Sequence, residues 1–380
     1  MKVLYIRSND ISFDSRSQKE LLAISKIPNL TIDILGWNRD GGNTKEVKED
    51  IYQIGDKTFT RYLVEIFAPW GRGGKANMMP LFHFMKSIKK WVNNHIDEYD
   101  AIHVVDLVTA HYVIPIAKKH NKKVIYDIFD YFADMKRYPK LIRNYFVKDD
   151  NKLISKADVT IICTDERRKQ LGNAKPNRLE IIHNSPDIKD ILPKERQKGS
   201  PIRFCYVGNL TEERYISMLL EYFANHEQYI FDIGGIGNLE EKVKQHSKEH
   251  KNIIYHGKMK YDNVLELENN SDILFALYNE NIPNHKYIAP NKFYEALALG
   301  KRLIAIKGTG LDNYFEQYDI GELIESNLDS LDNAINTLIQ NQDKWYQLGL
   351  KERQLFDESF SWSIMEDRLI KIYKDILEIK

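Results

Sequence analysis

Residues 289–305 read APNKFYEALALGKRLIA. Apolar residues recur there at helical spacing from Asn291 onward, Pro290 suits the start of a helix, and Gly300 suits its end. A short apolar run, Arg302–Ile306, follows at once and has the composition of a strand that is buried on both faces. A helix that leads directly into such a strand indicates an α/β fold with a parallel sheet.

The same alternation of short apolar runs and helical patterns extends over the whole chain. It predicts parallel sheets that carry helices on both faces. The expected strands are Lys2–Arg7, Leu30–Gly36, Ala101–Val105, Lys123–Ile128, Val159–Cys163, Leu179–His183, Ile202–Gly208, Tyr229–Gly234, Asn252–His256, Ile273–Leu277, Arg302–Ile306 and Gly321–Ile324. The expected helices include Thr109–His120, Glu213–His226, Leu239–His250, Asn291–Gly300 and Ser361–Lys380.

One segment interrupts the alternation. Residues 184–201 contain three prolines and many charges with little periodicity, which is typical of an interdomain linker. The pattern therefore predicts two α/β domains of similar size, residues 1–190 and 191–360, and a C-terminal helix over residues 361–380. We expect ligands to bind at the carboxyl ends of the strands, in a cleft between the two sheets.

The composition of the chain excludes several classes of protein. Basic and acidic residues each number 55, so the net charge is zero and we expect no nucleic-acid partner. The two cysteines, Cys163 and Cys205, are too few for a disulfide framework or a structural zinc site and fit a reducing compartment. No apolar run reaches 18 residues, so we expect a cytoplasmic protein that is soluble or lies at the inner face of the cell membrane.

The start of the helix at residue 291 has the features of an anion-binding site. The first N–H groups of a helix have no partner within the helix and attract phosphate. Lys292 adds a positive charge at this end, and the carboxylate of Glu295 is suited to accept hydrogen bonds from a ribose diol. The alternative is an ordinary amphipathic helix with solvated Lys292 and Glu295, and periodicity alone does not separate the two.

The stretch PNKFYEALALGKRLIA resembles the signature of family 4 glycosyltransferases, which are retaining enzymes that use sugar nucleotides. Other stretches resemble parts of this family in the same order: YVGNLTEER, GGIGNLEEKV, IIYHGKM, NNSDILFALYN and FSWSIMEDRLIKIY. In the first half, LGWNRDG, DAIHVVDLVTA and VIYDIFDYFAD resemble a branch that builds capsule, lipopolysaccharide and exopolysaccharide. The resemblance implies the GT-B fold, in which two Rossmann-like domains face each other. The first domain, with the C-terminal crossover helix, would bind the acceptor, and the second would bind the donor.

The resemblance also implies which residues bind the donor. Arg214 matches the basic residue of the family's phosphate loop, and Lys292 lies in the signature helix. Both are expected to be catalytic, because they would stabilise the negative charge that develops on the leaving diphosphate. The implied donor-binding set is Gly208, Asn209, Arg214, Gly235, His256, Tyr278, Pro290, Asn291, Lys292, Phe293 and Glu295.

Two positions depart from the family's pattern. Asn209 stands where an arginine often follows the loop glycine, and Tyr287 stands where a glutamate often lies eight residues before Glu295. The glutamate that is replaced usually contacts the donor sugar. Backbone amides at the start of the signature helix are the alternative contacts, and Glu280 is an outside candidate.

A metal ion is not expected in this reaction. Many sugar transferases hold a divalent ion with an Asp-x-Asp pair, and no such pair occurs in the 380 residues. The resemblance implies that basic side chains and helix N-termini stabilise the leaving phosphate instead. We therefore expect no metal site and no cofactor, with a nucleoside-diphosphate sugar as co-substrate.

Two carboxylates of the first half follow expected strands, Asp106 and Asp130. Either side chain is placed to orient or deprotonate an acceptor hydroxyl, and either is equally suited to cap a helix. We favour them over His103 and His111 as catalytic residues. We favour still more a mechanism in which the leaving phosphate accepts the acceptor's proton and the product keeps the α configuration.

A basic stretch suggests where the acceptor binds. No acidic residue occurs from Ile66 to Ile96, and the helix expected over Leu81–Ile96 has an apolar face opposite Lys86, Lys89 and Lys90. The simpler interpretation is a helix that packs on the core and is solvated on its other side. The alternative is peripheral membrane contact through residues 70–95, which include Arg72 and Lys75, because the acceptor would be a glycan or a lipid-linked saccharide.

Other functions are weaker but remain open. GGIGN at residues 234–238 lacks the third glycine of a dinucleotide fingerprint and favours a tight turn between strand and helix. A sugar-nucleotide epimerase would have the same fold, although no acid–base set for it is evident. From a different class, the chain could be a non-catalytic subunit that binds a sugar nucleotide for a partner transferase, which Asn209 and Tyr287 favour slightly.

Overall fold

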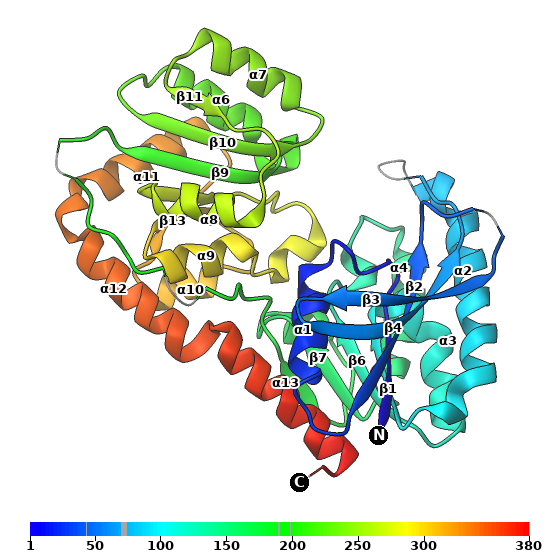
Figure 1. Cartoon of the computed structure of the whole chain (residues 1–380). Coiled ribbons are helices and arrows are strands. Elements are labelled where there is room, and N and C mark those ends of the chain that lie inside the picture. Colours follow the sequence, from blue (N-terminus) through cyan, green and yellow to red (C-terminus); the bar gives the residue numbers. More distant parts are fainter. Residues whose placement is uncertain (43, 70–73, 189–190, 198, 380) are drawn as a thin grey trace. The chain divides into compact units, whose positions relative to one another are not determined.

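The structure is a computed structural model that describes residues 1–42, 44–69, 74–188, 191–197 and 199–379. The chain forms two compact units (Figure 1). Unit 1 comprises Met1–Ile182 and Met365–Lys380, and unit 2 comprises His183–Ile364. The boundaries between the units therefore lie at residues 182 and 364, where the sequence pattern predicted 190 and 360.

Unit 1 is built on an eight-stranded sheet with the order β3-β4-β2-β1-β5-β6-β7-β8. Every neighbouring pair is parallel except β3 and β4, which form an antiparallel hairpin. The predicted parallel sheet is confirmed except at this edge, where the two strands of the hairpin were missed. The strands are β1 (Lys2–Ile6), β2 (Thr31–Asn38), β3 (Val47–Ile54), β4 (Lys57–Glu65), β5 (Ala101–Val105), β6 (Lys123–Ile128), β7 (Val159–Ile162) and β8 (Leu179–Ile181).

The two faces of this sheet are covered by different helices. The helices are α1 (Ser15–Ile24), α2 (Gly74–His95), α3 (Asp106–Lys119), α4 (Lys140–Ile154), the short α5 (Arg167–Gln170) and α13 (Trp362–Leu377). On one face, apolar side chains such as Leu4 and Ile102 pack against α2, α3 and α4. On the other face, Tyr5 and His103 contact α1 and α13 through hydrogen bonds. This second face therefore carries buried polar groups as well as apolar ones.

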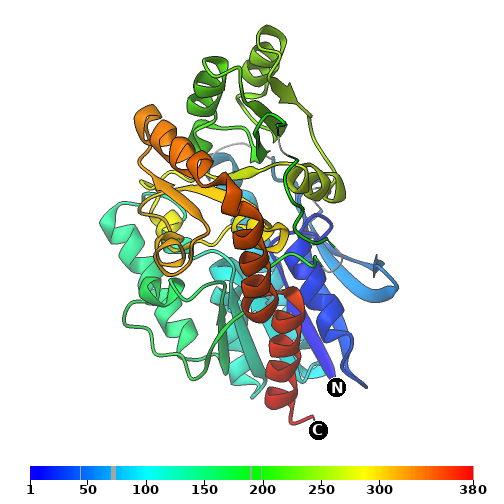
Figure 2. The same cartoon turned by 90° about the vertical axis from the view of Figure 1, so that its left-hand side faces the viewer.

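Helix α13 ends the chain on unit 1 although the sequence before it belongs to unit 2. It ends at the edge of the unit 1 sheet from which β1 starts (Figures 1 and 2). Its Tyr373 lies 2.6 Å from Nδ1 of His103, and its Asp375 pairs with Arg178. These contacts fix the helix on the sheet.

Unit 2 is built on a six-stranded sheet with the order β11-β10-β9-β12-β13-β14, and its strands are all parallel. Almost every side chain of the central strands is buried, as expected for a sheet with both faces covered. The strands are β9 (Arg203–Asn209), β10 (Ile230–Ile236), β11 (Ile253–Tyr255), β12 (Ile273–Ala276), β13 (Arg302–Ile306) and β14 (Gly321–Ile324).

Seven helices surround the unit 2 sheet in the part of the chain that the structure describes. They are α6 (Ile216–Ala224), α7 (Glu240–Glu249), α8 (Tyr261–Asn269), α9 (Asn291–Leu299), α10 (Asp312–Gln317), α11 (Leu328–Gln340) and α12 (Trp345–Leu355). Helices α6, α7 and α11 contribute to the core on one face, and α8 and α9 to the core on the other. Helix α9 ends at Gly300, which adopts a left-handed conformation with φ of 61°.

The segment expected to be a linker packs against unit 2. Ile188 is buried in the core beside α9, and the side chain of Pro193 lies next to Gly300. Arg353 of α12 donates a hydrogen bond to the carbonyl oxygen of Ile191. The segment predicted as the interdomain linker is therefore packed on unit 2, where Ile188 lies beside α9 and Pro193 lies at its end.

Candidate functional site

Two glycines meet at the carboxyl edge of the unit 2 sheet. Gly208 is the last but one residue of β9 and pairs with Gly235 of β10. Gly235 has φ of +125°, and a β-carbon built on it would lie 1.8 Å from the carbonyl oxygen of Gly208. Only glycine fits such a close approach of two backbones. The structure thus places both predicted glycines side by side and gives GGIGN the role of a tight turn.

The loop after β9 carries Arg214 on a short helical turn, Glu212–Arg214. The guanidinium of Arg214 lies 3.8 Å from the ring centroid of Tyr278. Among the described residues no carboxylate pairs with Arg214, and its buried Nη1 has no hydrogen-bond partner. A partly buried cation without a counter-ion is costly unless a ligand supplies the negative charge. The structure therefore brings Arg214 and Tyr278 together as a site for an anion.

Lys292 lies nearby but is not free. Its ammonium donates to Oε1 of Glu268 at 2.9 Å and lies 3.9 Å from Oε2 of Glu295. Burial opposes the charged form, but the two carboxylates outweigh it and hold the pKa of Lys292 above its usual range. Glu268 of α8 and Glu295 of its own helix therefore already balance the charge of Lys292, and its predicted contact with phosphate stays a prediction.

Two further members of the predicted set are buried by the packing of α9. Phe293 is fully buried among aromatic rings, including that of Tyr314 at 4.7 Å, so its side chain belongs to the core and only its backbone is left for the predicted donor contact. Glu295 is 3% exposed and accepts a hydrogen bond from the hydroxyl of Tyr261 at 3.0 Å. Its carboxylate is thus already engaged by Tyr261 and Lys292.

The start of α9 keeps the features expected of it. Pro290 is the residue before the first turn, and no side chain caps this end of the helix in the described region. Asn291 is exposed, and its Oδ1 accepts a hydrogen bond from Asn184 at 3.0 Å. The first amides of α9 therefore remain suited to a phosphate or a sugar hydroxyl.

The remaining residues considered for donor binding differ in their exposure and in their hydrogen bonds. Asn209 is exposed at the end of β9. His256 follows β11, and its Nε2 lies 2.8 Å from Oδ1 of the buried Asp232, so that nitrogen is engaged. Glu280 accepts a hydrogen bond from Tyr215, a residue in the left-handed region with φ of 54° that leads into α6. Glu280 thus holds the loop of Arg214 in place.

In unit 1, Asp106 has a structural role. It has φ of 61° at the junction of β5 and α3, an uncommon conformation for a residue other than glycine. Its carboxylate accepts from the guanidinium of Arg7 and from the amides of Phe129 and Asp130. Burial raises the pKa of Asp106, and Arg7 opposes that shift. These three donors engage the carboxylate within the fold, and the catalytic role of Asp106 stays a prediction.

Asp130 differs from Asp106 in its exposure. Its side chain is 48% exposed and lies 3.3 Å from the guanidinium of Arg167, which is itself buried. It follows β6, at the same carboxyl edge of the sheet as Asp106. Of the two predicted carboxylates, Asp130 is the more exposed. Arg7 and Arg167, its neighbours at this edge, were not singled out from the sequence.

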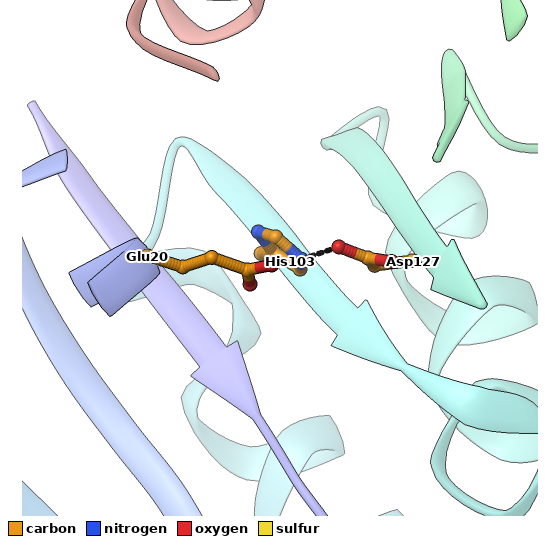
Figure 3. Close-up of side chains that lie close together, drawn as sticks. All are labelled: Glu20, His103 and Asp127. Carbon is orange, nitrogen blue, oxygen red and sulfur yellow. Dashed lines mark ion pairs between the residues drawn. The ribbon is translucent and has the colours of Figure 1, made fainter. Parts of the chain in front are cut away.

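A separate cluster of Glu20, His103 and Asp127 lies on the α1 face of the unit 1 sheet (Figure 3). In the described region it is the one group with the composition of a metal site, and all three side chains are fully buried. Arg16 donates to Oε1 of Glu20 at 2.8 Å and to Oδ1 of Asp127 at 3.0 Å. A guanidinium that already contacts both carboxylates would repel a cation, so the cluster is a buried ion network.

Residues 187–354, which lie within unit 2, match the family model described as glycosyl transferases group 1. The match includes Arg214, Tyr278 and the whole of α9. The chain is a glycosyltransferase by enzyme class. No curated protein is similar enough in sequence to be matched.

Solved structures have the same fold as this transferase. A sucrose-phosphate synthase from Thermosynechococcus elongatus is 14% identical, with a TM-score of 0.75 and full coverage of both chains. HepE from Anabaena, solved with UDP, is 13% identical with a TM-score of 0.67, over 99% of this chain and 100% of that one. A putative UDP-N-acetylglucosamine 2-epimerase from Listeria monocytogenes is 13% identical with a TM-score of 0.65, over 100% and 97%. These likenesses confirm the GT-B fold of the transferase.

Proposed function

We propose that this transferase moves a sugar from a nucleoside-diphosphate sugar to a hydroxyl of a glycan or lipid-linked acceptor, without a metal ion and with retention of the α configuration. The observation that carries the proposal is the guanidinium of Arg214, which stacks on Tyr278 and has no counter-ion among the described residues. A diphosphate supplies that counter-ion, and an arginine fork matches its oxygen atoms.

The chemistry needs stabilisation of a leaving group more than a base. The acceptor oxygen attacks the anomeric carbon on the face from which the diphosphate leaves, and the bond from that carbon to the phosphate oxygen breaks. The acceptor's proton passes to the leaving phosphate, so no side chain has to take it up. Arg214 and the first amides of α9 neutralise the developing charge, and such preorganised electrostatic stabilisation usually contributes most to the rate enhancement of an enzyme.

In this proposal each unit binds one of the two substrates. Unit 2 binds the donor through Gly208, Gly235, Arg214 and the start of α9. Unit 1 binds the acceptor at the carboxyl edge of its sheet, where Asp130 orients the reacting hydroxyl. UDP is the first nucleotide to test, because HepE, which has the same fold, was solved with it.

The proposal is tested by product analysis. Purified protein is incubated with UDP-, GDP-, ADP- and dTDP-sugars in the presence of EDTA, and nucleoside diphosphate release and glycan products are followed by mass spectrometry and NMR. We expect one donor to be consumed and an α-linked product to form. Inversion at the anomeric carbon, or a strict need for added Mg²⁺, would contradict the mechanism.

A donor-binding subunit without turnover is the second candidate. Lys292 is neutralised by Glu268 and Glu295, so one of the two cations expected in the phosphate site contributes no net charge. In that case the sugar nucleotide binds, but the bond between its sugar and its diphosphate is not broken. Binding of a sugar nucleotide without any release of nucleoside diphosphate, across the whole donor panel, would favour this candidate.

We also propose that unit 1 touches a membrane surface through α2 and α4. The main apolar face of α2 packs on the core, with Phe84 stacked 4.7 Å from Trp37, as the simpler interpretation predicted. Its N-terminal half nevertheless exposes Met78, Met79 and Phe82. Helix α4 exposes Leu141, Ile142 and Tyr145 in its own first turns. Lys86, Lys89 and Lys90 are exposed on α2, whereas Arg72 and the side chain of Lys75 lie outside the described residues.

Exposed apolar side chains beside lysines suit the interface of anionic lipids. No helix in the described part of the chain is long and apolar enough to cross a bilayer. We expect the protein to sediment with vesicles that contain phosphatidylglycerol, and the triple variant Met78→Ser, Met79→Ser, Phe82→Ser to bind them at least tenfold more weakly. Leu350→Ser, which removes an exposed leucine of unit 2, is the matched control. Equal sedimentation of the triple variant would remove the proposed contact.

A further inference from the structure

Unit 2 has a cavity of about 330 Å³ at the edge of its sheet opposite to Arg214. Asp272 and Lys301, which line it, directly precede β12 and β13, whereas Gly208 and Gly235 lie at the other ends of β9 and β10. Because all six strands are parallel, the cavity and the donor site lie at opposite edges of the sheet. The cavity is therefore distinct from the donor site.

The cavity contains a buried lysine without a partner. Lys301 is 7% exposed, and in the described region its ammonium forms no hydrogen bond or ion pair. Asp272 and Glu352, the carboxylates that act on Lys301, each contact another cation. Asp272 accepts from the amide of Arg203 at 2.9 Å and lies 3.4 Å from Arg196. Glu352 pairs with Arg302, and both of these side chains are almost fully buried.

The remaining lining favours an anionic ligand with an organic part. Four basic side chains face three acidic ones in the wall of the cavity, and two of the acidic ones, Glu195 and Asp343, are exposed at its rim. Trp345 and Tyr346 supply an apolar wall. Burial lowers the pKa of Lys301 to about 8, although Asp272 acts in the opposite direction, so the uncompensated charge is costly without a ligand.

We propose that this cavity is a second ligand site, which binds a small phosphate ester through Lys301, with Arg196 and Lys194 beside it. A phosphate group provides the counter-ion that Lys301 lacks, and the volume of the cavity exceeds what a bare ion needs. The proposal does not depend on the reaction assigned to the donor site.

The test is calorimetric titration of the full chain with inorganic phosphate and with glucose 6-phosphate. We expect both to bind the wild type and Arg214→Ala, and to bind Lys301→Met at least tenfold more weakly. Lys251→Met, which removes an exposed lysine of unit 2, is expected to bind like the wild type. Tighter binding of glucose 6-phosphate than of phosphate would support an ester, and equal binding would overturn the ester in favour of free phosphate.

Three results would overturn the site altogether. These are wild-type affinity in Lys301→Met, loss of all phosphate binding in Arg214→Ala, and no binding of either probe to the wild type. Lys301→Gln serves as a second variant should the methionine disturb folding. We expect both variants to fold, because each removes an uncompensated buried charge.

Discussion

Arg214→Ala is expected to lower kcat/KM by about 10²–10³-fold on whichever donor the transferase consumes, because one preorganised donor to a developing negative charge has that effect in enzymes. The melting temperature should change little, since Arg214 has no ion pair in the described part of the chain and its main contact is the ring of Tyr278. The measurement is initial-rate kinetics of nucleoside diphosphate release together with a thermal melt of the same preparations.

One further variant separates charge from geometry at this position, and a variant in unit 1 serves as the control. Arg214→Lys keeps the charge but loses the fork, so we expect a smaller loss than in the alanine variant. Arg168→Ala removes an arginine that is half exposed on unit 1 and, among the described residues, pairs with the surface carboxylate of Asp165. This variant should keep full activity. Wild-type turnover in Arg214→Ala would rule out electrostatic stabilisation by this side chain.

Arg16→Met is expected to destabilise unit 1 by about 3–5 kcal/mol, because removal of one partner leaves the others as uncompensated buried charges. Glu20 and Asp127 are fully buried, and Arg16 donates to both of them. The measurement is the free energy of unfolding by chemical denaturation at pH 7. An unchanged free energy would show that the cluster is not held by this ion network.

The pH dependence of the free energy of unfolding of Arg16→Met gives a second test. Burial and Asp127 already raise the pKa of Glu20, and Arg16 opposes this shift. Without Arg16 the pKa of Glu20 in the folded state rises further above that of the unfolded chain. The loss of stability therefore applies at neutral pH and is relieved as Glu20 binds a proton. The variant should therefore regain stability from pH 8 towards pH 5.

A second arginine of unit 1, Arg61, serves as a control for whether the buried carboxylates Glu20 and Asp127 cause the loss of stability. Arg61 is also nearly buried in unit 1, but its partner Asp50 is 45% exposed and stays solvated when the arginine is removed. Arg61→Met is expected to cost about 1 kcal/mol, as for a partly exposed pair. The triple variant Arg16→Met, Glu20→Gln, Asp127→Asn should recover part of the loss.

Most of the strands were predictable because they are buried on both faces. Ala101–Val105, Lys123–Ile128 and Arg302–Ile306 were predicted with the bounds that the structure has. The hairpin of β3 and β4 was missed because β3 is an exposed edge strand with few buried residues, so it lacks an apolar run. Its signal was present in the alternating sequence around Gly55 and Asp56, which form the two-residue turn.

The candidate site was predictable only where one local motif defines it. Gly208, Gly235 and Arg214 belong to short motifs, and the structure brings them to one edge of a sheet. The ion pair of Lys292 with Glu268 could not be predicted from the sequence, because Glu268 lies on another helix and 24 residues away. The same holds for Asp106, whose carboxylate is taken up by Arg7 from the neighbouring strand.

The most direct measurement is calorimetric titration of the wild-type protein with UDP, GDP, ADP and dTDP, in EDTA and again with Mg²⁺. If Arg214 and the amides of α9 hold the diphosphate by themselves, one nucleotide binds with the same affinity in both conditions and binds Arg214→Ala far more weakly. Binding that appears only with Mg²⁺, or equal affinity in Arg214→Ala, would contradict the proposed donor site.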